Sequence, residues 1–195
     1  MRDCVEQALA EAAEALDRAR RSDAVLDAIT RAGELLAGRL EQGGRAFSCG
    51  NGGSMCDAMH FAEELSGRFR NDRPGMAATA ISDPSHISCV ANDYGYEQVF
   101  SRYLEAHARS GDVLLAISTS GTSGNVVRAA EVAGEMGVHC IALTGHPGRR
   151  LGELAEVEIC TPGGRYADRV QEMHIKVIHI LIELTERIRY PDTPQ

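Results

Sequence analysis

Between residues 46 and 188, short apolar segments alternate with helix-like segments, and this alternation restricts the possible fold more than any other feature of the chain. Apolar runs of four to seven residues are typical of strands buried on both faces. Helices between consecutive strands indicate parallel pairing and cover both faces of the sheet. The pattern predicts an α/β fold, a three-layer α/β/α sandwich with a five-stranded parallel sheet and sites at the carboxyl ends of its strands. The expected strands are 46–49, 77–81, 112–117, 138–144 and 157–160.

Residues 1–42 precede this alternation and are rich in alanine, leucine, glutamate and arginine. Apolar residues at three- and four-residue spacing predict a helical hairpin, broken near Arg21, where Ser22 or Asp23 caps the second helix. The second helix has an apolar stripe suited to packing on the sheet, whereas the first is expected to pack on another subunit. We interpret residues 1–195 as a single domain in which 1–42 serve packing and oligomerisation.

Composition limits the partners of the chain. Its formal net charge is -8, it has no tryptophan, and it contains no basic cluster, so neither a nucleic-acid groove nor a membrane-surface helix is expected. There is no signal peptide and no apolar run near 18 residues, which predicts a cytoplasmic protein. The six cysteines form no C-x-x-C pair, and we expect free core thiols rather than disulfides or a zinc knuckle.

A glycine-rich turn, Gly50 to Gly53, follows the first predicted strand. Glycines allow backbone torsions or a close ligand approach that a Cβ atom would prevent. A strand, a glycine turn and a helix together place free N–H groups at the carboxyl edge of the sheet, where phosphates bind favourably. The spacing differs from G-x-G-x-x-G, so a dinucleotide cofactor is not expected. The alternative is a tight turn that binds no ligand.

The helix predicted after this turn carries His60 and Glu64 four residues apart. They project from one face at a separation of about 6 Å along the axis. Such a pair can share an ion or a substrate, although an ordinary surface pair has the same spacing. Its place shortly after the glycine turn favours the functional interpretation.

A second turn, Ser118 to Gly124, joins the third predicted strand to a helix expected at 125–136. Its clustered hydroxyl groups lie beside the N–H groups and the positive end of that helix, which together predict a neutral phosphate cradle. The alternative is that the hydroxyls only cap the helix, but a cap needs one or two of them.

The helix predicted over 168–188 is apolar on more than one side, which indicates burial in the core or in a subunit interface. Gln171, His174 and His179 interrupt its apolar surface, and the alternative to a functional role is that a buried histidine only hydrogen-bonds to a neighbour.

Segments from about Gly43 to Glu186 resemble, in the same order, the phosphoheptose isomerases of the sugar isomerase (SIS) domain family. The resemblance implies conversion of sedoheptulose 7-phosphate to D-glycero-D-manno-heptose 7-phosphate, the first step toward the heptose of lipopolysaccharide cores or other surface glycans. It also implies a cytoplasmic homotetramer with sites at subunit interfaces. The segments are C-G-N-G-G-S, H-F-A-E-E-L, I-S-D-P-S-H-I-S-C-V-A-N-D, S-T-S-G-T-S-G-N-V and Y-A-D-R-V-Q-E-M-H-I-K-V-I-H-I-L-I.

The resemblance implies roles for residues that match the family's motifs. Glu64 would be the general base and His179 the general acid. One zinc ion per subunit, as in the metal-containing members, would be bound by His60, Glu64, Gln171 and His179, and we predict that this centre is completed across a subunit interface. Gln171 and His179 are eight residues apart on their helix, about 12 Å along the axis and about 80° around it, near the limit for reaching one ion between them. The implied substrate contacts are Asn51, Gly52, Gly53, Glu64, Asn92, Asp93, Ser118, Thr119, Ser120, Ser123 and Gln171, with Asp168 in a supporting role.

The chemistry agrees with these roles. Moving a carbonyl from C2 to C1 needs a base that transfers a proton between the two carbons, and an acid or Lewis acid that stabilises the enediolate oxygen. A carboxylate and an imidazole suffice. Zinc could polarise the carbonyl as well, but a glutamate that binds zinc is a weaker base, so the two roles of Glu64 compete.

Two other functions compete with this interpretation. One is a different phosphosugar isomerase with the same fold. The other is a non-catalytic binding protein, similar to the replication-initiator-associating members of the family, which needs no acid–base pair. Glu64 and His179 together favour an enzyme. A sugar-phosphate sensor usually carries a DNA-binding segment, and none is visible in this sequence.

Overall fold

The computed structural model describes residues 1–161, 163–164 and 166–192. Its five strands form one sheet in the order β2-β1-β3-β4-β5, and every neighbouring pair is parallel. The predicted strand positions differ from the observed ends by at most one residue. The strands are β1 (Ala46–Gly50), β2 (Ala78–Ala80), β3 (Val113–Ser118), β4 (His139–Thr144) and β5 (Val157–Cys160).

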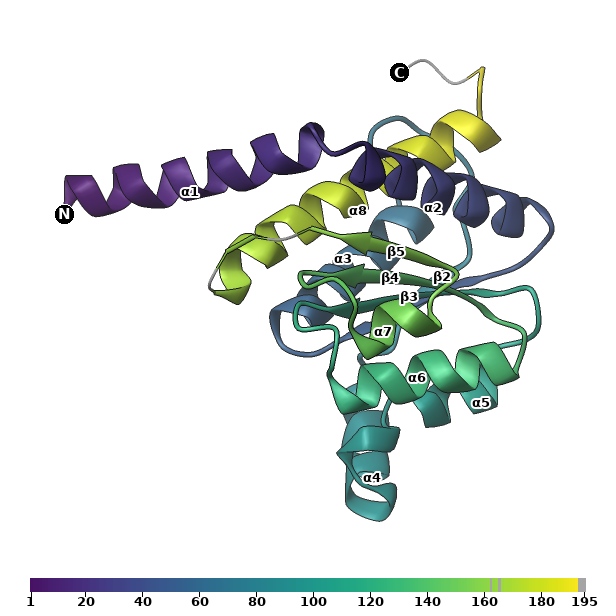
Figure 1. Ribbon diagram of the computed structural model, residues 1–195. Coiled ribbons are helices and arrows are strands. Elements are labelled where there is room, and N and C mark those ends of the chain that lie inside the picture. Colours follow the sequence, from purple (N-terminus) through teal and green to yellow (C-terminus); the bar gives the residue numbers. More distant parts are fainter. Residues whose placement is uncertain (162, 165, 193–195) are drawn as a thin grey trace.

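Helices cover both faces of the sheet, as Figure 1 shows. The helices α2, α3 and α8 pack on one face around a core that includes Leu36, Phe61 and Ile178, and α4 to α7 pack on the other around Phe100 and the apolar side of α6. This confirms the three-layer sandwich. The helices are α1 (Arg2–Arg20), α2 (Asp23–Glu41), α3 (Gly53–Ser66), α4 (Pro84–Tyr94), η1 (Tyr96–Gln98, a 3₁₀ turn), α5 (Ser101–His107), α6 (Gly124–Glu135), α7 (Arg150–Leu154) and α8 (Ala167–Arg189).

The structure adds one element and corrects one prediction. The short helix α7, between β4 and β5, is not among the elements predicted from the sequence, and it buries Leu151 completely. The expectation of six core thiols was wrong in part, because Cys4, Cys56 and Cys89 are exposed. All six cysteines are free, as predicted.

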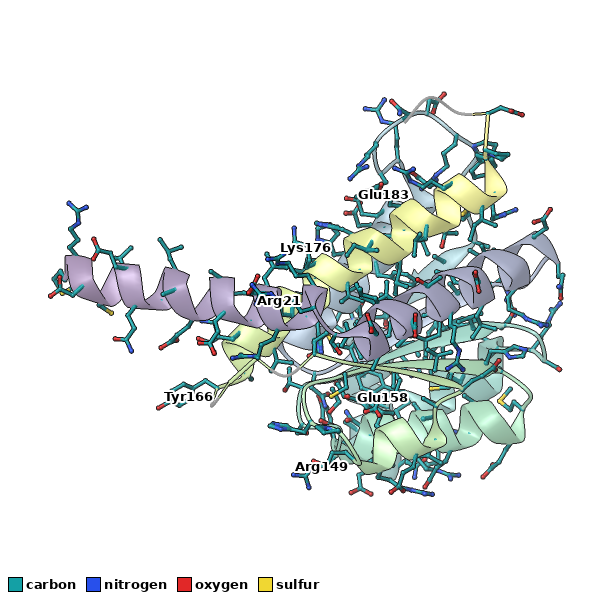
Figure 2. The ribbon with its side chains drawn as sticks, turned by 45° about the horizontal axis from the view of Figure 1, so that its top comes forward. Arg21, Arg149, Glu158, Tyr166, Lys176 and Glu183 are labelled. Carbon is teal, nitrogen blue, oxygen red and sulfur yellow. The ribbon has the colours of Figure 1, made fainter. Side chains whose placement is uncertain are left out.

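The N-terminal helices meet at the predicted break, and Ser22 caps α2 by accepting a hydrogen bond from the amide of Val25 at 3.4 Å. Beyond this point α1 extends away from the body of the molecule (Figures 1 and 2). Its apolar side chains Val5 and Leu9 are 59% and 67% exposed, so this helix has an apolar face that residues 1–161, 163–164 and 166–192 leave uncovered. In the described part of the chain, no helix has the length and hydropathy needed to cross a membrane.

Candidate active site

The glycine turn after β1 depends on glycine at two positions. Gly52 has a φ of 55°, in the left-handed region that favours glycine. At Gly53 a Cβ atom would lie 2.7 Å from Nε2 of Gln171, so a larger residue would displace that side chain. The turn therefore places Asn51, Gly52 and Gly53 at the start of α3, directly beside Gln171 of α8.

The hydroxyl groups of the second turn gather at the start of α6. Ser118 Oγ lies 3.3 Å from Ser120 Oγ and 3.0 Å from Ser123 Oγ, and Thr119 lies half-buried between the first two serines. Ser123 is the N-cap residue of α6, yet its side chain makes no capping hydrogen bond. The hydroxyls thus face one another beside the positive end of a helix, which is the arrangement expected of a phosphate cradle rather than of a cap.

Side chains join the two turns. The amide groups of Asn51 and Asn125 exchange two hydrogen bonds, both 2.8 Å long. The hydroxyl of Tyr96 donates to Asn51 Oδ1 at 3.0 Å. Asn125 is buried, so its amide is committed to this pair. Sequence reasoning missed Asn125 and Tyr96, because their role depends on where the two turns meet in space.

Three predicted site residues meet between α3 and α8, and we call them the α3–α8 cluster: His60, Glu64 and His179. His60 Nε2 lies 3.3 Å from Glu64 Oε1 and 3.3 Å from His179 Nε2. All three side chains are half-buried. The two helices bring them together within one chain, so this part of the centre needs no second subunit.

The surroundings favour a neutral imidazole at His179. Burial lowers the pKa of His179 first, the nearby His60 lowers it further, and Glu64 opposes the shift. The ring of Phe69, from the loop after α3, packs against His179 with ring centroids 5.6 Å apart. A neutral ring can bind a metal ion or exchange a proton near neutral pH.

Asp57 lies one turn before His60 on α3, and sequence reasoning did not select it. Its Oδ2 atom is buried and makes no hydrogen bond to any described atom. Desolvation raises the pKa of Asp57 to about 6, and His60 opposes the shift. A carboxyl group of this kind stores a proton beside the α3–α8 cluster at slightly acidic pH.

Three predicted residues lie neither in the two turns nor in the α3–α8 cluster. Asn92 and Asp93 end α4, where both are exposed and Asn92 Nδ2 donates to Asp93 Oδ1 at 2.7 Å. Asp168 is exposed in the first turn of α8 and accepts a hydrogen bond from the amide of Arg169 at 2.8 Å. None of their described contacts reaches the cluster.

The sequence and the fold have close relatives. Residues 7–145 match the model of the SIS domain. A phosphoheptose isomerase of Proteus mirabilis is 57% identical over 185 residues, which cover 95% of this chain and 96% of that protein. One of Salmonella paratyphi B is 58% identical with the same coverage. The chain belongs to the phosphoheptose isomerase family.

Solved structures of phosphoheptose isomerases share the whole fold. The structure of the phosphoheptose isomerase of Neisseria gonorrhoeae matches with a TM-score of 0.87 at 37% identity, over 95% of this chain and 98% of that one. A phosphoheptose isomerase of Francisella tularensis matches with a TM-score of 0.89 at 31% identity, over 95% and 97% of the two chains. Membership of the phosphoheptose isomerases confirms the predicted SIS fold and the prediction of an isomerase.

In this member of the phosphoheptose isomerase family, the α3–α8 cluster fits a divalent cation. One ligand atom from each of His60, Glu64 and His179 lies within 4.8 Å of the other two. Two imidazole nitrogens and a carboxylate oxygen are donors that zinc prefers. Gln171, the fourth predicted ligand, lies about two turns before His179 on α8, where it contacts Gly53 of α3. The cluster thus supplies three of the four predicted ligands.

Proposed function

We propose that this protein converts sedoheptulose 7-phosphate to D-glycero-D-manno-heptose 7-phosphate. The observation that carries the proposal is the meeting of Glu64 and His179 between α3 and α8, in a chain 57% identical to a phosphoheptose isomerase over almost its whole length. The two turns at the carboxyl edge of the sheet support a phosphorylated substrate. The product is a seven-carbon aldose phosphate of the kind that heptose-containing surface glycans require.

Glu64 acts as the base in this proposal. Its carboxylate removes a proton from C1 of the ketose and returns it to C2, so that the carbonyl moves from C2 to C1. His179 moves a proton to and from the oxygens of the enediolate. The side chain of Glu64 is 17% exposed, and this partial burial limits the competition of water for its oxygens.

The two turns bind and orient the sugar phosphate. Ser118, Ser120 and Ser123 offer hydroxyl donors to the phosphate at the N-terminus of α6. Asn51 is fixed by its bonds to Asn125, so its backbone and those of the neighbouring glycines are ordered before the substrate binds. The reacting carbons are thereby held beside Glu64.

We assign one zinc ion per subunit to His60, Glu64 and His179, with Gln171 as the fourth ligand. When bound, the ion would supply a Lewis acid that polarises the carbonyl and stabilises negative charge on its oxygen. A Glu64 oxygen that binds the ion is a weaker base, so the other carboxylate oxygen must accept the proton.

The assembly that we propose is a cytoplasmic homotetramer with sites at subunit interfaces. The side chain of His60 is 38% exposed in the single chain, whereas an enediolate must be shielded from water. A neighbouring subunit that covers the α3–α8 cluster would provide that shield. Asn92 and Asp93, which do not contact the cluster of their own chain, are available to contact the substrate of a neighbour.

Incubation of the protein with sedoheptulose 7-phosphate, followed by NMR, tests the proposed activity. We expect the aldose signals of D-glycero-D-manno-heptose 7-phosphate to grow at a rate proportional to enzyme concentration. If sedoheptulose 7-phosphate remains unchanged while a five- or six-carbon ketose phosphate is isomerised, the substrate is a different phosphosugar. Binding of the heptulose phosphate without turnover would indicate a non-catalytic protein.

A further inference from the structure

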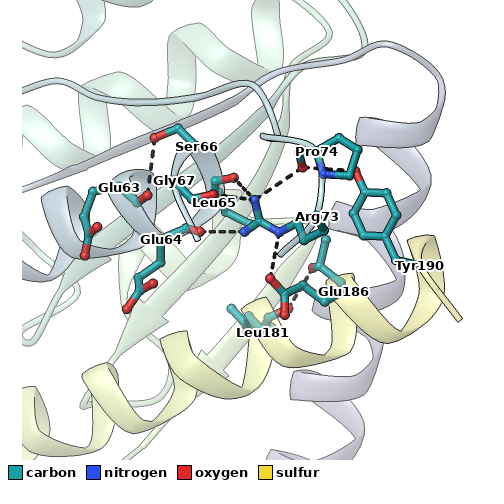
Figure 3. A network of polar contacts seen from close by, with 11 residues as sticks. Glu63, Glu64, Leu65, Ser66, Gly67, Arg73, Pro74, Leu181, Glu186 and Tyr190 are labelled. Atoms are coloured by element: carbon teal, nitrogen blue, oxygen red, sulfur yellow. Dashed lines mark hydrogen bonds and ion pairs between the residues drawn. The ribbon is translucent and has the colours of Figure 1, made fainter. Parts of the chain in front are cut away.

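A buried arginine lies directly behind the α3–α8 cluster. Arg73, in the loop between α3 and β2, has a side chain that is 2% exposed, and each of its three guanidinium nitrogens donates a hydrogen bond (Figure 3). Nη2 donates to the carbonyl of Glu64 at 2.6 Å, and Nη1 donates to those of Leu65 and Gly67 at 2.8 Å. Nε donates to Glu186 Oε1 of α8 at 2.7 Å. One side chain thus holds the last turn of α3 and the far part of α8.

The bonds to α3 satisfy carbonyls that the end of a helix leaves without partners. A positive charge at this end is also favoured by the helix dipole. One of these carbonyls belongs to Glu64 itself, so Arg73 contacts the backbone of the proposed base directly. The planar fork of arginine donates in several fixed directions, which the ammonium group of lysine does not reproduce.

The bond to Glu186 links α8, through Arg73, to the end of α3. The two helices lie side by side in the same direction, because Gly53 meets Gln171 and His60 meets His179 further along both. Glu186 lies seven residues beyond His179, hence on the same face of α8. Slippage of one helix by a single turn, about 5 Å, would separate the members of the α3–α8 cluster.

We propose that Arg73 is a positioning residue for the reaction: its buried pair with Glu186 and its bonds to the end of α3 set the register in which Glu64 meets His179. Removing one partner of a buried ion pair is costly, because it leaves the other charge without compensation. The best-attested role of such pairs is to specify the register in which elements pack. The role in catalysis rests on the proposed function, but the register itself does not.

The test compares Arg73→Lys with a matched control, Arg45→Lys, in the full-length protein. Arg45 also bonds a buried carboxylate and a backbone carbonyl, those of Asp112 at 2.8 Å and His107 at 2.7 Å. That group lies at the amino ends of β1 and β3, away from the cluster. Both variants are assayed well below their melting temperatures, with folding checked by circular dichroism.

We expect Arg73→Lys to lower kcat roughly 10- to 100-fold while KM stays within about twofold, because a displacement near 1 Å affects the base more than the phosphate contacts. Arg45→Lys should retain kcat even if its melting temperature falls as far. Crystal structures should show the His60 Nε2 to His179 Nε2 distance longer than the present 3.3 Å only in Arg73→Lys.

Several results would overturn the proposal: wild-type kcat in folded Arg73→Lys, an equal loss of kcat in Arg45→Lys, or an unchanged distance between the two histidines. If Arg73→Lys does not fold, Glu186→Gln replaces it, since this variant keeps the bonds to α3 and weakens only the link to α8. The same loss of kcat at constant KM is then expected. If the wild-type protein does not isomerise the heptulose phosphate, the proposed function fails, and the histidine distance still decides the role of Arg73 in the register.

Discussion

Glu64 carries two proposed roles, those of general base and of zinc ligand, and one substitution tests its role as the base. Glu64→Gln keeps the size of the side chain but removes its basicity, so we expect kcat to fall by roughly 10² to 10⁴. KM should change little, because the serine turn still binds the phosphate. Zinc content is measured in the same samples, since a lost metal ion would lower turnover as well. Near-wild-type turnover in a folded variant would assign the base to another residue.

His174 gives the clearest prediction of pH dependence. It is fully buried on α8, its Nε2 donates to the carbonyl of Thr144 at 3.2 Å, and burial lowers its pKa to about 4. Because the unfolded chain binds this proton below about pH 6.5 and the folded one does not, folding stability is lost as pH falls from 6.5 through 4. The loss approaches about 3 kcal/mol.

His174→Gln removes this titration and retains a donor for the carbonyl of Thr144. Urea unfolding at pH 7 and at pH 4 should show a smaller acid loss in the variant, by about 3 kcal/mol. The carboxylates contribute equally to both proteins, so they cancel in the comparison. Parallel pH profiles for the two proteins would show that His174 is not the buried neutral group described here.

At the scale of single residues, the sequence predicted which residues belong to the site better than it predicted which side chains they contact. His60 and Glu64 could be selected because they share one helix face shortly after the glycine turn, and His179 because it interrupts an apolar helix. Arg73 and Asn125 could not, since an arginine in a polar loop and an asparagine at a helix start are ordinary in sequence. Their roles arise only when distant segments pack, so no local pattern marks them.

At the scale of elements, the strands and long helices followed from periodicity and from their turns, because burial between two layers dictates an apolar run. The short helix α7 did not, since five residues contain too little of a repeat to be recognised. The short elements η1 and α5 are equally hard to recognise, because they contain three and seven residues. The parallel packing of α3 on α8, which builds the α3–α8 cluster, depends on tertiary contacts alone.

The turn between β3 and α6 supports a prediction about binding. Replacing Ser118 and Ser120 by alanine removes two hydroxyl donors, so KM should rise roughly 10- to 100-fold while kcat changes far less, because the phosphate is held in the ground state as in the transition state. Ser22→Ala, at the cap of α2, serves as the control and should affect only stability. An unchanged KM in the folded double variant would place the phosphate elsewhere.

At the scale of the whole molecule, α1 presents an apolar face that the described part of the chain leaves exposed. Val5, Leu9 and Leu16 lie at four- and seven-residue spacing on α1 and are 59%, 67% and 44% exposed. A helix with such a face needs a partner, and the proposed tetramer supplies one. Leu9→Glu with Leu16→Glu should therefore yield smaller particles in size-exclusion chromatography with light scattering.

The single chain should still fold with this double change, because neither leucine is buried in it, and activity should fall with the oligomer. Gln7→Glu, which adds one charge to the same helix, controls for charge alone and should leave the assembly intact. A tetramer that survives the double substitution would assign the interface to another surface.

The central claim is that α3 and α8 of one chain build one acid–base centre. Mixing inactive Glu64→Gln subunits with inactive His179→Ala subunits, after demonstrated subunit exchange, tests it most directly. In every mixed oligomer each chain then lacks one of the two groups, so we predict that no heptulose phosphate isomerase activity returns. Recovered activity would mean that Glu64 of one subunit works with His179 of another, which would contradict the arrangement described here.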